Sequence, residues 1–349
     1  MMDLCTLFDS NYLDRGIALC ESLNRVSDHF RLYVFAFDES AYRILKELNI
    51  RNVTVVSEES ILDDELRRIR QERSRSEYCW TCTPVIVEYV LDHYGVEACT
   101  YIDADMYFYS SPEFVFEEIK GKKCSASIIE HRFPNNITRS TNLRLHGKYC
   151  VEFNTFFNTE ESRKILTWWK KKCFESCSMK LNEESFGDQK YLDEWEKRFG
   201  NIHEVENAGA GVAPWNLSDY RLEGKESNGI YLTYKGKQRV KLVFYHFQNL
   251  RFLDENTVNI GVYNEIGRKD RALINELYIY YVKRLVEIRK YLKNKYNLNF
   301  KAYENRKKGS KWKYTGLKDL VAYIAIYINI RVRSKKDIYL IGRNMAMHS

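Results

Sequence analysis

The chain has 349 residues, a length typical of about two domains or of one large α/β domain with an appendage. With 44% hydrophobic and 14% aromatic residues it can bury a substantial core, which excludes a largely disordered chain; 4 Pro and 16 Gly exclude collagen-like and Pro-rich architectures. The mean hydropathy is −0.51 and no run of about 18 uncharged apolar residues occurs, so we expect no membrane-spanning helix. Residues 1–9 are typical of a short strand, so we expect no leader segment.

Strand and helix signals alternate along the first third of the chain. Apolar runs predict strands over 4–8, 32–37, 53–56 and 99–102. Helical periodicity predicts helices over 13–23, 41–48 and 84–94, with Pro84 in the first turn of the last, and a charged helix over 60–75. This alternation indicates an α/β fold with a parallel sheet.

The later chain contains further strand signals over 126–129, 151–157, 230–234 and 240–245, and helix signals over 160–177 and 186–199. Charge and periodicity change near 265–270. We therefore expect a catalytic domain over 1–265 and a helical, basic region over 266–349.

The net charge of +7 is unevenly distributed. Residues 283–349 hold 18 Lys and Arg against 4 Asp and Glu, whereas residues 1–282 hold 37 against 44. Such a basic end indicates contact with an anionic surface. The apolar stretch 320–330 is too short to span a bilayer, and residues 305–314 mix cations with aromatic rings. These features favour a helix that lies on an anionic membrane, with packing onto the catalytic domain as the alternative and nucleic acid as a weaker one.

The nine cysteines are odd in number, which indicates reduced thiols in the cytoplasm. Cys79, Cys82, Cys173 and Cys177 have spacings that a zinc site could use. About 90 residues separate the two pairs, so we favour ordinary buried thiols.

The strongest chemical signal is Asp103-Ala104-Asp105, which follows an apolar strand directly. Ligands of open α/β sheets lie at the carboxyl ends of strands, and two carboxylates there favour Mg²⁺ or Mn²⁺ that also takes diphosphate oxygens. The alternative is a simple turn with an Asp cap.

The first strand leads into a polar loop, Asp9-Ser10-Asn11-Tyr12, followed by a helix. Together with Asp103 and Asp105, this pattern resembles the GT-A glycosyltransferases, and specifically the retaining family-8 group. The resemblance covers roughly residues 3–255. It implies a Rossmann-like mixed sheet with helices on both faces, a UDP-sugar donor and bound Mn²⁺ or Mg²⁺.

Later segments also resemble motifs of that family, in the same order: Glu152-Phe-Asn154-Thr155, Gly187-Asp188-Gln189, Pro214-Trp215-Asn216 and the His246 segment. The resemblance implies a nucleotide site made of Thr6, Phe8, Asp9, Asn11, Tyr12, Asp103 and Ala104. It implies donor-sugar or acceptor contacts by Glu130, Asn154, Thr155, Asp188, Gln189 and Trp215, with Asp188 and Gln189 at the reacting sugar. The implied metal ligands are Asp103, Asp105 and His246.

Two features depart from the family pattern. The helix before Asp103 offers no cation to the nucleotide, and the nearest ones are Arg73 and Arg75. After His246 the chain has Gln248 and Arg251 where the family has Gly and Lys, so we expect these two to meet the diphosphate.

Each of these residues also has a plainer interpretation. His246 could be an ordinary buried polar group, Asn154 a turn former, Asp188 a helix cap, and Gly209 and Gly211 parts of a simple loop. Taken together, the pattern predicts a cytoplasmic, metal-dependent retaining glycosyltransferase, peripheral at the inner membrane face, that transfers a hexose to a lipopolysaccharide, O-antigen or capsule acceptor, free or lipid-linked. The alternatives are a sugar-nucleotide pyrophosphorylase and a non-catalytic sugar-nucleotide-binding protein. A pyrophosphorylase would need a Gly-rich basic loop after the first strand, which the 8–12 segment lacks.

Overall fold

The computed structural model describes residues 1–180, 186–301 and 337–340. The helices are α1 (Leu13–Val26), α2 (Glu39–Leu48), α3 (Asp64–Glu72), α4 (Arg75–His93), α5 (Glu113–Gly121), α6 (Arg139–His146), α7 (Glu160–Glu175), α8 (Trp195–Phe199) and α9 (Arg271–Tyr296). The basic and apolar stretches at 305–314 and 320–330 lie outside the described residues.

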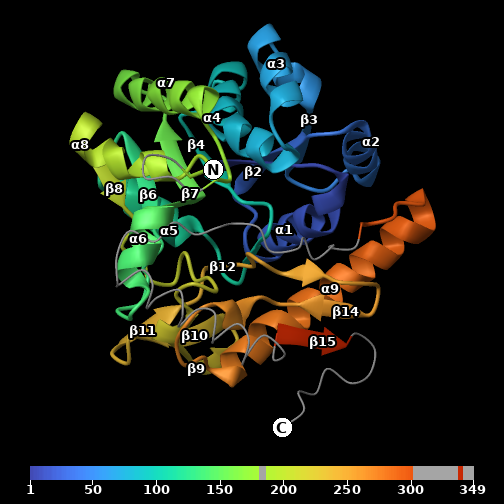
Figure 1. Ribbon diagram of the computed structural model, residues 1–349, viewed down its shortest axis with the longest axis vertical. Coiled ribbons are helices and arrows are strands. Elements are labelled where there is room, and N and C mark those ends of the chain that lie inside the picture. The colour runs from blue at the N-terminus through green and yellow to red at the C-terminus, as the bar shows by residue number, and fades with distance from the viewer. Residues whose placement is uncertain (181–185, 302–336, 341–349) are drawn as a thin grey trace.

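A seven-stranded mixed sheet forms the centre of the molecule, in the order β3-β2-β1-β4-β7-β6-β8 (Figure 1). Only β7 runs antiparallel to its two neighbours, β4 and β6. The strands are β1 (Met2–Phe8), β2 (Phe30–Ala36), β3 (Val53–Ser57), β4 (Ala98–Ile102), β6 (Ala126–Glu130), β7 (Tyr149–Phe157) and β8 (Ile202–Glu204).

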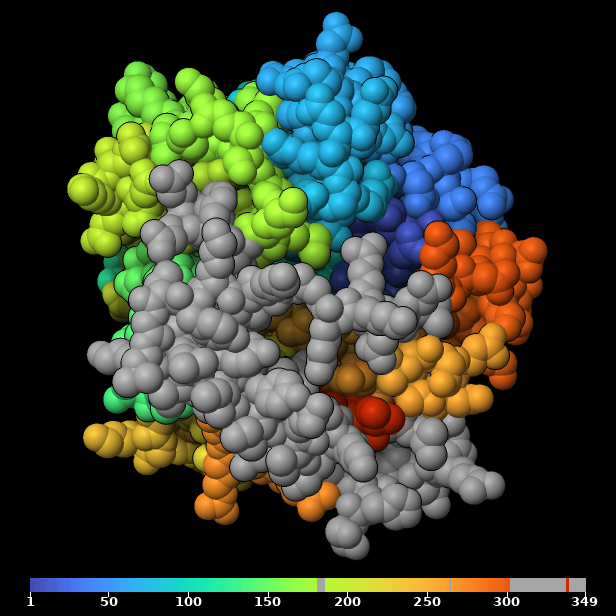
Figure 2. Space-filling view, viewed as in Figure 1, coloured from blue at the N-terminus to red at the C-terminus, as the bar shows by residue number. Residues whose placement is uncertain are grey.

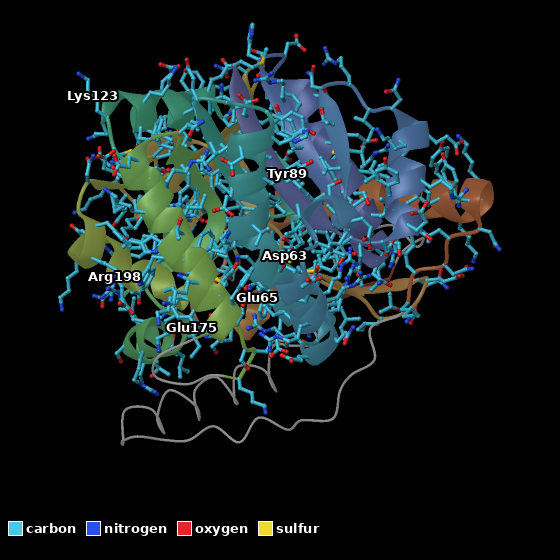
Figure 3. All side chains as sticks on the ribbon, turned by 90° about the horizontal axis from the view of Figure 1, so that it is seen from above. Asp63, Glu65, Tyr89, Lys123, Glu175 and Arg198 are labelled. Atoms are coloured by element: carbon cyan, nitrogen blue, oxygen red, sulfur yellow. The ribbon has the colours of Figure 1, made fainter. Side chains whose placement is uncertain are left out.

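Helices cover both faces of this sheet because its strands are apolar on both sides. On one face, alternate residues such as Leu7 and Tyr101 pack under α4 and α7, which lie side by side in Figure 3. On the other face, residues such as Leu4 and Val34 share a core with α1, α2, α5 and α9. The predicted α/β class, with a mixed sheet and helices on both faces, is confirmed.

Three small sheets complete the described chain. An antiparallel sheet joins β9 (Tyr220–Glu226), β10 (Gly229–Tyr234) and β11 (Gln238–Lys241). A second pairs β5 (Met106–Phe108) with β12 (Phe244–His246). The third joins β13 (Arg251–Phe252), β14 (Thr257–Asn259) and β15 (Ile338–Leu340). Among the described residues, no helix is both long enough and apolar enough to cross a bilayer.

The helix predicted to begin at Pro84 begins nine residues earlier. Ser74 and Glu77 form a capping box, which satisfies the first free backbone N–H groups and starts α4 at Arg75. Pro84 lies inside the helix, where it removes one backbone hydrogen bond. The charged stretch 60–75 is correspondingly divided between a 3₁₀ turn at Glu58–Ile61, α3 and the start of α4.

Two other predicted elements are divided as well. The first residues of the apolar run 240–245 form the end of β11, which pairs with β10, and its last residues form the start of β12, which pairs with β5. Periodicity does not reveal that the two ends of one apolar run pair with strands of different sheets. The predicted helix 186–199 is a 3₁₀ segment, Lys190–Glu194, followed by the short α8, because Gly187 has a positive φ of 55° that interrupts a helix.

The predicted boundary near 265–270 coincides with the loop before α9. Residues of α9 such as Leu277 and Tyr281 belong to the same buried core as the strands of the large sheet. The division into two domains stays a prediction.

Candidate functional site

The candidate site lies where β1 and β4 end. These strands are neighbours in the sheet, yet the chain between them continues through β2 and β3 on the far side of β1. This is a topological switch point, where the loops after two adjacent parallel strands separate and leave room for a ligand. Asp9 follows β1 and Asp103 follows β4, so the sheet brings both carboxylates to one edge.

Asp103, Asp105 and His246 converge at this edge. The Nε2 atom of His246 lies 3.0 Å from Asp105 Oδ1 and 3.6 Å from Asp103 Oδ2. The small β5–β12 sheet produces this approach, because it pairs His246 with Met106, the residue after Asp105. One ligand atom from each of the three side chains lies within 4.8 Å of the others. Two carboxylates and an imidazole form a donor set that suits Mn²⁺ or Mg²⁺.

The charges of the three groups are strongly coupled. Burial, and then the Asp105 carboxylate, raise the pKa of Asp103 to about 8, although His246 acts in the opposite direction. Burial alone would lower the pKa of His246, but Asp105 outweighs it and raises that pKa well above the ordinary value. Although burial acts in the opposite direction, His246 lowers the pKa of Asp105, so the proton is held by Asp103 and His246. A divalent cation would supply the positive charge that favours two ionised carboxylates here.

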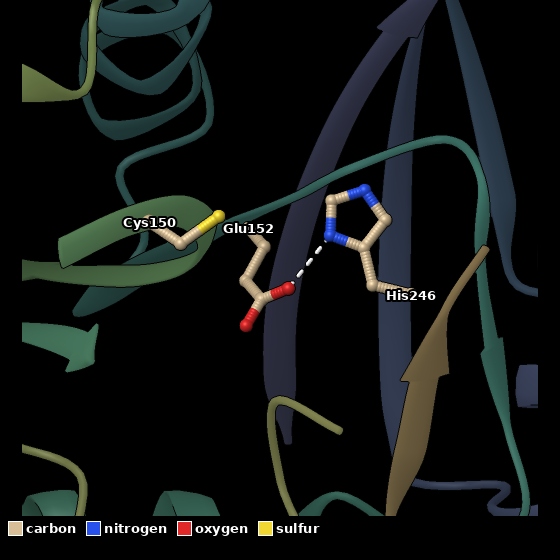
Figure 4. A group of neighbouring side chains, drawn as sticks. All are labelled: Cys150, Glu152 and His246. Atoms are coloured by element: carbon tan, nitrogen blue, oxygen red, sulfur yellow. Dashed lines mark hydrogen bonds and ion pairs between the residues drawn. The ribbon is translucent and has the colours of Figure 1, made fainter. Parts of the chain in front are cut away.

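His246 is held from its other side by Glu152. The Nδ1 atom of His246 and Oε2 of Glu152 are 2.7 Å apart, and both side chains are buried (Figure 4). Cys150, Glu152 and His246 form a second group of close ligand atoms. Trp215 packs edge-on against the His246 ring, with ring centroids 5.3 Å apart.

The predicted nucleotide residues surround the end of β1. Asp9 caps a short 3₁₀ turn by accepting a hydrogen bond from Asn11 N at 3.0 Å. The Tyr12 side chain is 44% exposed. Burial of its hydroxyl, and then the carboxylates of Asp105 and Asp103, raise the pKa of Tyr12. Thr6 and Phe8 are buried in the strand, and a side chain at Gly16 of α1 would overlap the Phe8 ring.

Two arginines that the sequence analysis did not place in the site lie beside these residues. Arg75 Nε donates to Asp9 Oδ2 at 3.2 Å, from the first turn of α4. Arg15 lies over the Tyr12 ring, 4.7 Å from its centroid, and adds positive charge near Asp105. The spacing of Ser74 and Glu77 is a sequence signal for a helix that begins at Arg75, but it does not show that the first turn faces the site.

The predicted sugar residues are brought together only in part. Asp188 is buried, acts electrostatically on Asp103 and shares a hydrogen bond with Thr83. Burial raises its pKa to about 7. Gln189 donates from Nε2 to the His146 carbonyl at 2.8 Å.

The remaining predicted contacts lie deeper or farther along the edge. Asn154 is fully buried, and its Oδ1 has no hydrogen-bond partner, whereas the Thr155 hydroxyl pairs with Thr100 inside the sheet. The charged groups around Glu130 are Glu204, Lys148 and Arg132. None of them belongs to the metal group, that is, Asp103, Asp105 and His246.

The predicted diphosphate residues are exposed beyond His246. Gln248 accepts from Asn249 at 3.4 Å, and Arg251 begins β13 and donates to Asn249 Oδ1 at 3.3 Å. Ala104 is buried between the two aspartates. All nine cysteines are free, and in the described part of the chain neither close group of metal-binding atoms includes Cys79, Cys82, Cys173 or Cys177.

No protein-family model matches the chain. Two proteins of Bacillus subtilis (strain 168) are similar to it over most of their length. The uncharacterized protein YfnF is 28% identical over 277 residues, which are 78% of this chain and 89% of YfnF. The uncharacterized protein YfnD is 28% identical over 284 residues, which are 79% of this chain and 86% of YfnD.

Several solved structures of glycosyltransferases are similar to this chain. The galactosyltransferase LgtC, solved with donor and acceptor sugar analogues, is 13% identical with a TM-score of 0.48, and the match covers 71% of this chain and 87% of LgtC. Mouse xyloside xylosyltransferase 1 is 11% identical with a TM-score of 0.45, and the match covers 71% of this chain and 98% of that protein. The glycosyltransferase GlyE of Streptococcus pneumoniae is 11% identical with a TM-score of 0.41, and the match covers 98% of this chain and 66% of GlyE.

Proposed function

We propose that this chain is a metal-dependent, retaining glycosyltransferase of the GT-A type that transfers a hexose from a UDP-sugar. One observation carries the proposal. Asp103, Asp105 and His246 converge at the switch point of the sheet although His246 is distant from the aspartates in sequence, and Asp188 acts electrostatically on Asp103. A non-catalytic scaffold would not require this convergence of ligands with a buried carboxyl group.

The proposed division of labour follows from the position of each residue. Asp9 and Arg75 present an acceptor and donors to the base, and Tyr12 offers an exposed ring for stacking. A divalent cation held by Asp103, Asp105 and His246 would act as a Lewis acid that stabilises negative charge on the leaving diphosphate. Arg251 and Gln248 would add hydrogen bonds to the diphosphate.

Asp188 and Gln189 would act at the sugar. A carboxyl group with a pKa of about 7 binds a sugar hydroxyl in either protonation state, and stabilises positive charge on the ring when ionised. Gln189, whose amide is oriented by the His146 carbonyl, would support the sugar during attack from the same face as the leaving group. Attack from that face would give retention of configuration at the anomeric carbon, as the resemblance to the retaining family implies.

The test is a panel of nucleotide sugars, each added with Mn²⁺ while the melting temperature is recorded. A donor that binds the folded chain at saturating concentration raises the stability by a few kcal/mol. Asp103→Asn removes this shift, whereas Asp28→Asn keeps it, because Asp28 lies at the opposite edge of the sheet, before β2. Release of UDP and an α linkage in the product, measured by NMR, support the proposal; pyrophosphate release or an inverted linkage contradicts it.

We further propose that the acceptor is a surface glycan, free or lipid-linked, at the cytoplasmic face of an anionic membrane. The support is the charge of residues 283–349, whose cations far outnumber their anions. Vesicles with anionic lipid should float the full chain, and the charge reversal Lys307→Glu, Lys308→Glu, Lys311→Glu should abolish flotation. Equal flotation of the two proteins would contradict membrane binding through this segment.

A further inference from the structure

We infer that Glu152 is a positioning residue that holds His246 for metal binding. The inference rests on the proposed function, because it concerns the same metal group. The carboxylate of Glu152 lies 2.7 Å from His246 Nδ1 (Figure 4). The other ring nitrogen, Nε2, faces Asp103 and Asp105.

An irregularity in β7 supports this position. The pairing of β6 with β7 shifts between Ser127, which pairs with Thr155, and Ile129, which pairs with Cys150. Four residues of β7 therefore lie opposite one residue of β6, and Glu152 is among them. Such a bulge re-aims a side chain that a regular strand would direct elsewhere.

Glu152 contacts two of the three metal-group residues. Its backbone carbonyl accepts a hydrogen bond from Asp103 N at 3.3 Å, while its side chain faces His246. One residue of β7 thus links the end of β4 to the end of β12. The position of Asp103 relative to the imidazole depends directly on it.

The hydrogen bond decides which ring nitrogen is available. When Glu152 accepts the Nδ1 proton, Nε2 is the ring nitrogen that faces Asp105 and Asp103 and that could give its lone pair to a metal ion. A carboxylate in this role fixes the tautomer and the orientation of a metal-binding histidine. Trp215 packs against the ring edge-on and restricts its rotation further.

A buried carboxylate has a cost that packing alone does not offset. The Glu152 side chain is fully buried, and its Oε1 has no hydrogen-bond partner. Direct coordination through Glu152 is the competing arrangement, since Cys150, Glu152 and His246 also form a close group. In the first arrangement Glu152 affects the metal only by holding His246. In the second, Glu152 is itself a metal ligand together with His246.

The experiment measures Mn²⁺ binding alone, by calorimetry and by Mn²⁺ electron paramagnetic resonance, on the full-length chain without nucleotide. Four variants are compared with the wild type: Glu152→Ala, Glu152→Gln, His246→Ala and the double variant Glu152→Ala, His246→Ala. Far-UV circular dichroism and metal-free melting establish that each is folded.

Glu152→Ala should weaken Mn²⁺ binding 10- to 100-fold. Glu152→Gln, whose amide oxygen can accept the same hydrogen bond, should retain an affinity between those of Glu152→Ala and the wild type, and it keeps the test available if Glu152→Ala does not fold. The double variant should bind as weakly as His246→Ala alone, because a residue that acts only through the ring has no further effect once the ring is gone.

The matched control is Glu118→Ala. Glu118 also holds an imidazole, that of His203, at 2.7 Å, and it should leave Mn²⁺ affinity unchanged. Unchanged affinity in Glu152→Ala, no recovery in Glu152→Gln, or additive losses in the double variant would overturn the inference. A wild-type chain that binds no Mn²⁺ would instead contradict the metal dependence of the proposed function.

Discussion

Arg289, near the end of α9, forms a 3.0 Å ion pair with Asp14, whose fully buried side chain lies at the start of α1. Asp14 also pairs with Arg15 at 3.1 Å, and Arg15 contributes positive charge near Asp105. The Arg289 guanidinium lies between the rings of Phe252 and Phe300, 3.8 and 4.4 Å from their centroids. Helix α9 is therefore joined by buried charges to the start of α1, directly after the loop that carries Asp9 and Tyr12.

Arg289→Ala should lower the free energy of unfolding by about 2 to 3 kcal/mol. The substitution leaves Asp14 buried with only one cationic partner, which is costly for a desolvated carboxylate. Urea unfolding measures the loss. Arg284→Ala on the same helix is the control, because its ion pair with Glu21 is about one-third exposed and should contribute at most about 1 kcal/mol. Equal losses in the two variants would contradict a special role for the buried pair.

Arg75→Ala should weaken the binding of UDP in the presence of Mn²⁺ about tenfold, or roughly 1.4 kcal/mol. The substitution removes a cationic donor that lies beside Asp9 at the end of β1. Calorimetric titration with UDP measures the change. Arg67→Ala is the matched control, since Arg67, on α3, forms an exposed ion pair with Glu59. An unchanged affinity in Arg75→Ala would remove Arg75 from the nucleotide site.

As the pH decreases from 7 to 5, His131 should lower the free energy of unfolding by about 2 kcal/mol. His131 is 4% exposed, and burial lowers its pKa to about 3. The unfolded chain binds a proton at this ring below about pH 6.5, whereas the folded chain does not. The stabilisation from His131 is therefore fully present above about pH 6.5 and is lost as the pH falls below it.

The measurement is urea unfolding of the wild type and of His131→Gln at pH 7 and pH 5. His246, Asp103 and Asp188 have raised pKa values and act in the opposite direction, and the difference between the two proteins isolates His131. Between pH 7 and pH 5, the change in the free energy of unfolding should be about 2 kcal/mol more favourable in the variant than in the wild type. Equal changes would show that His131 is protonated in the folded chain.

Asp337→Ala should locally destabilise the β14–β15 pairing. Both oxygens of this buried carboxylate accept the Tyr263 backbone N–H, at 3.0 and 3.1 Å, directly before β15 begins. Losing the acceptor removes this buried hydrogen bond at a cost of about 1 to 2 kcal/mol. Amide hydrogen exchange at Tyr263 and Val258 should become faster in this variant but not in Glu255→Ala, which changes an exposed side chain.

The sequence by itself determined the alternation of strands and helices, and with it the α/β class. Apolar runs such as 99–102 read as strands because burial on both faces requires continuous apolar residues. Asp103 and Asp105 could also be chosen from the sequence, because they directly follow the apolar strand. His246 was chosen because its segment resembles a motif of the glycosyltransferase family.

Only the tertiary structure decided which distant residues meet. The β6–β7 irregularity turns Glu152 toward His246, the capping box at Ser74 brings Arg75 to Asp9, and the docking of α9 places Arg289 on Asp14. Each contact depends on strand order, register or helix packing, which arise from the whole core at once. Periodicity within one segment carries no information about its partner, so these residues could not be assigned from the sequence.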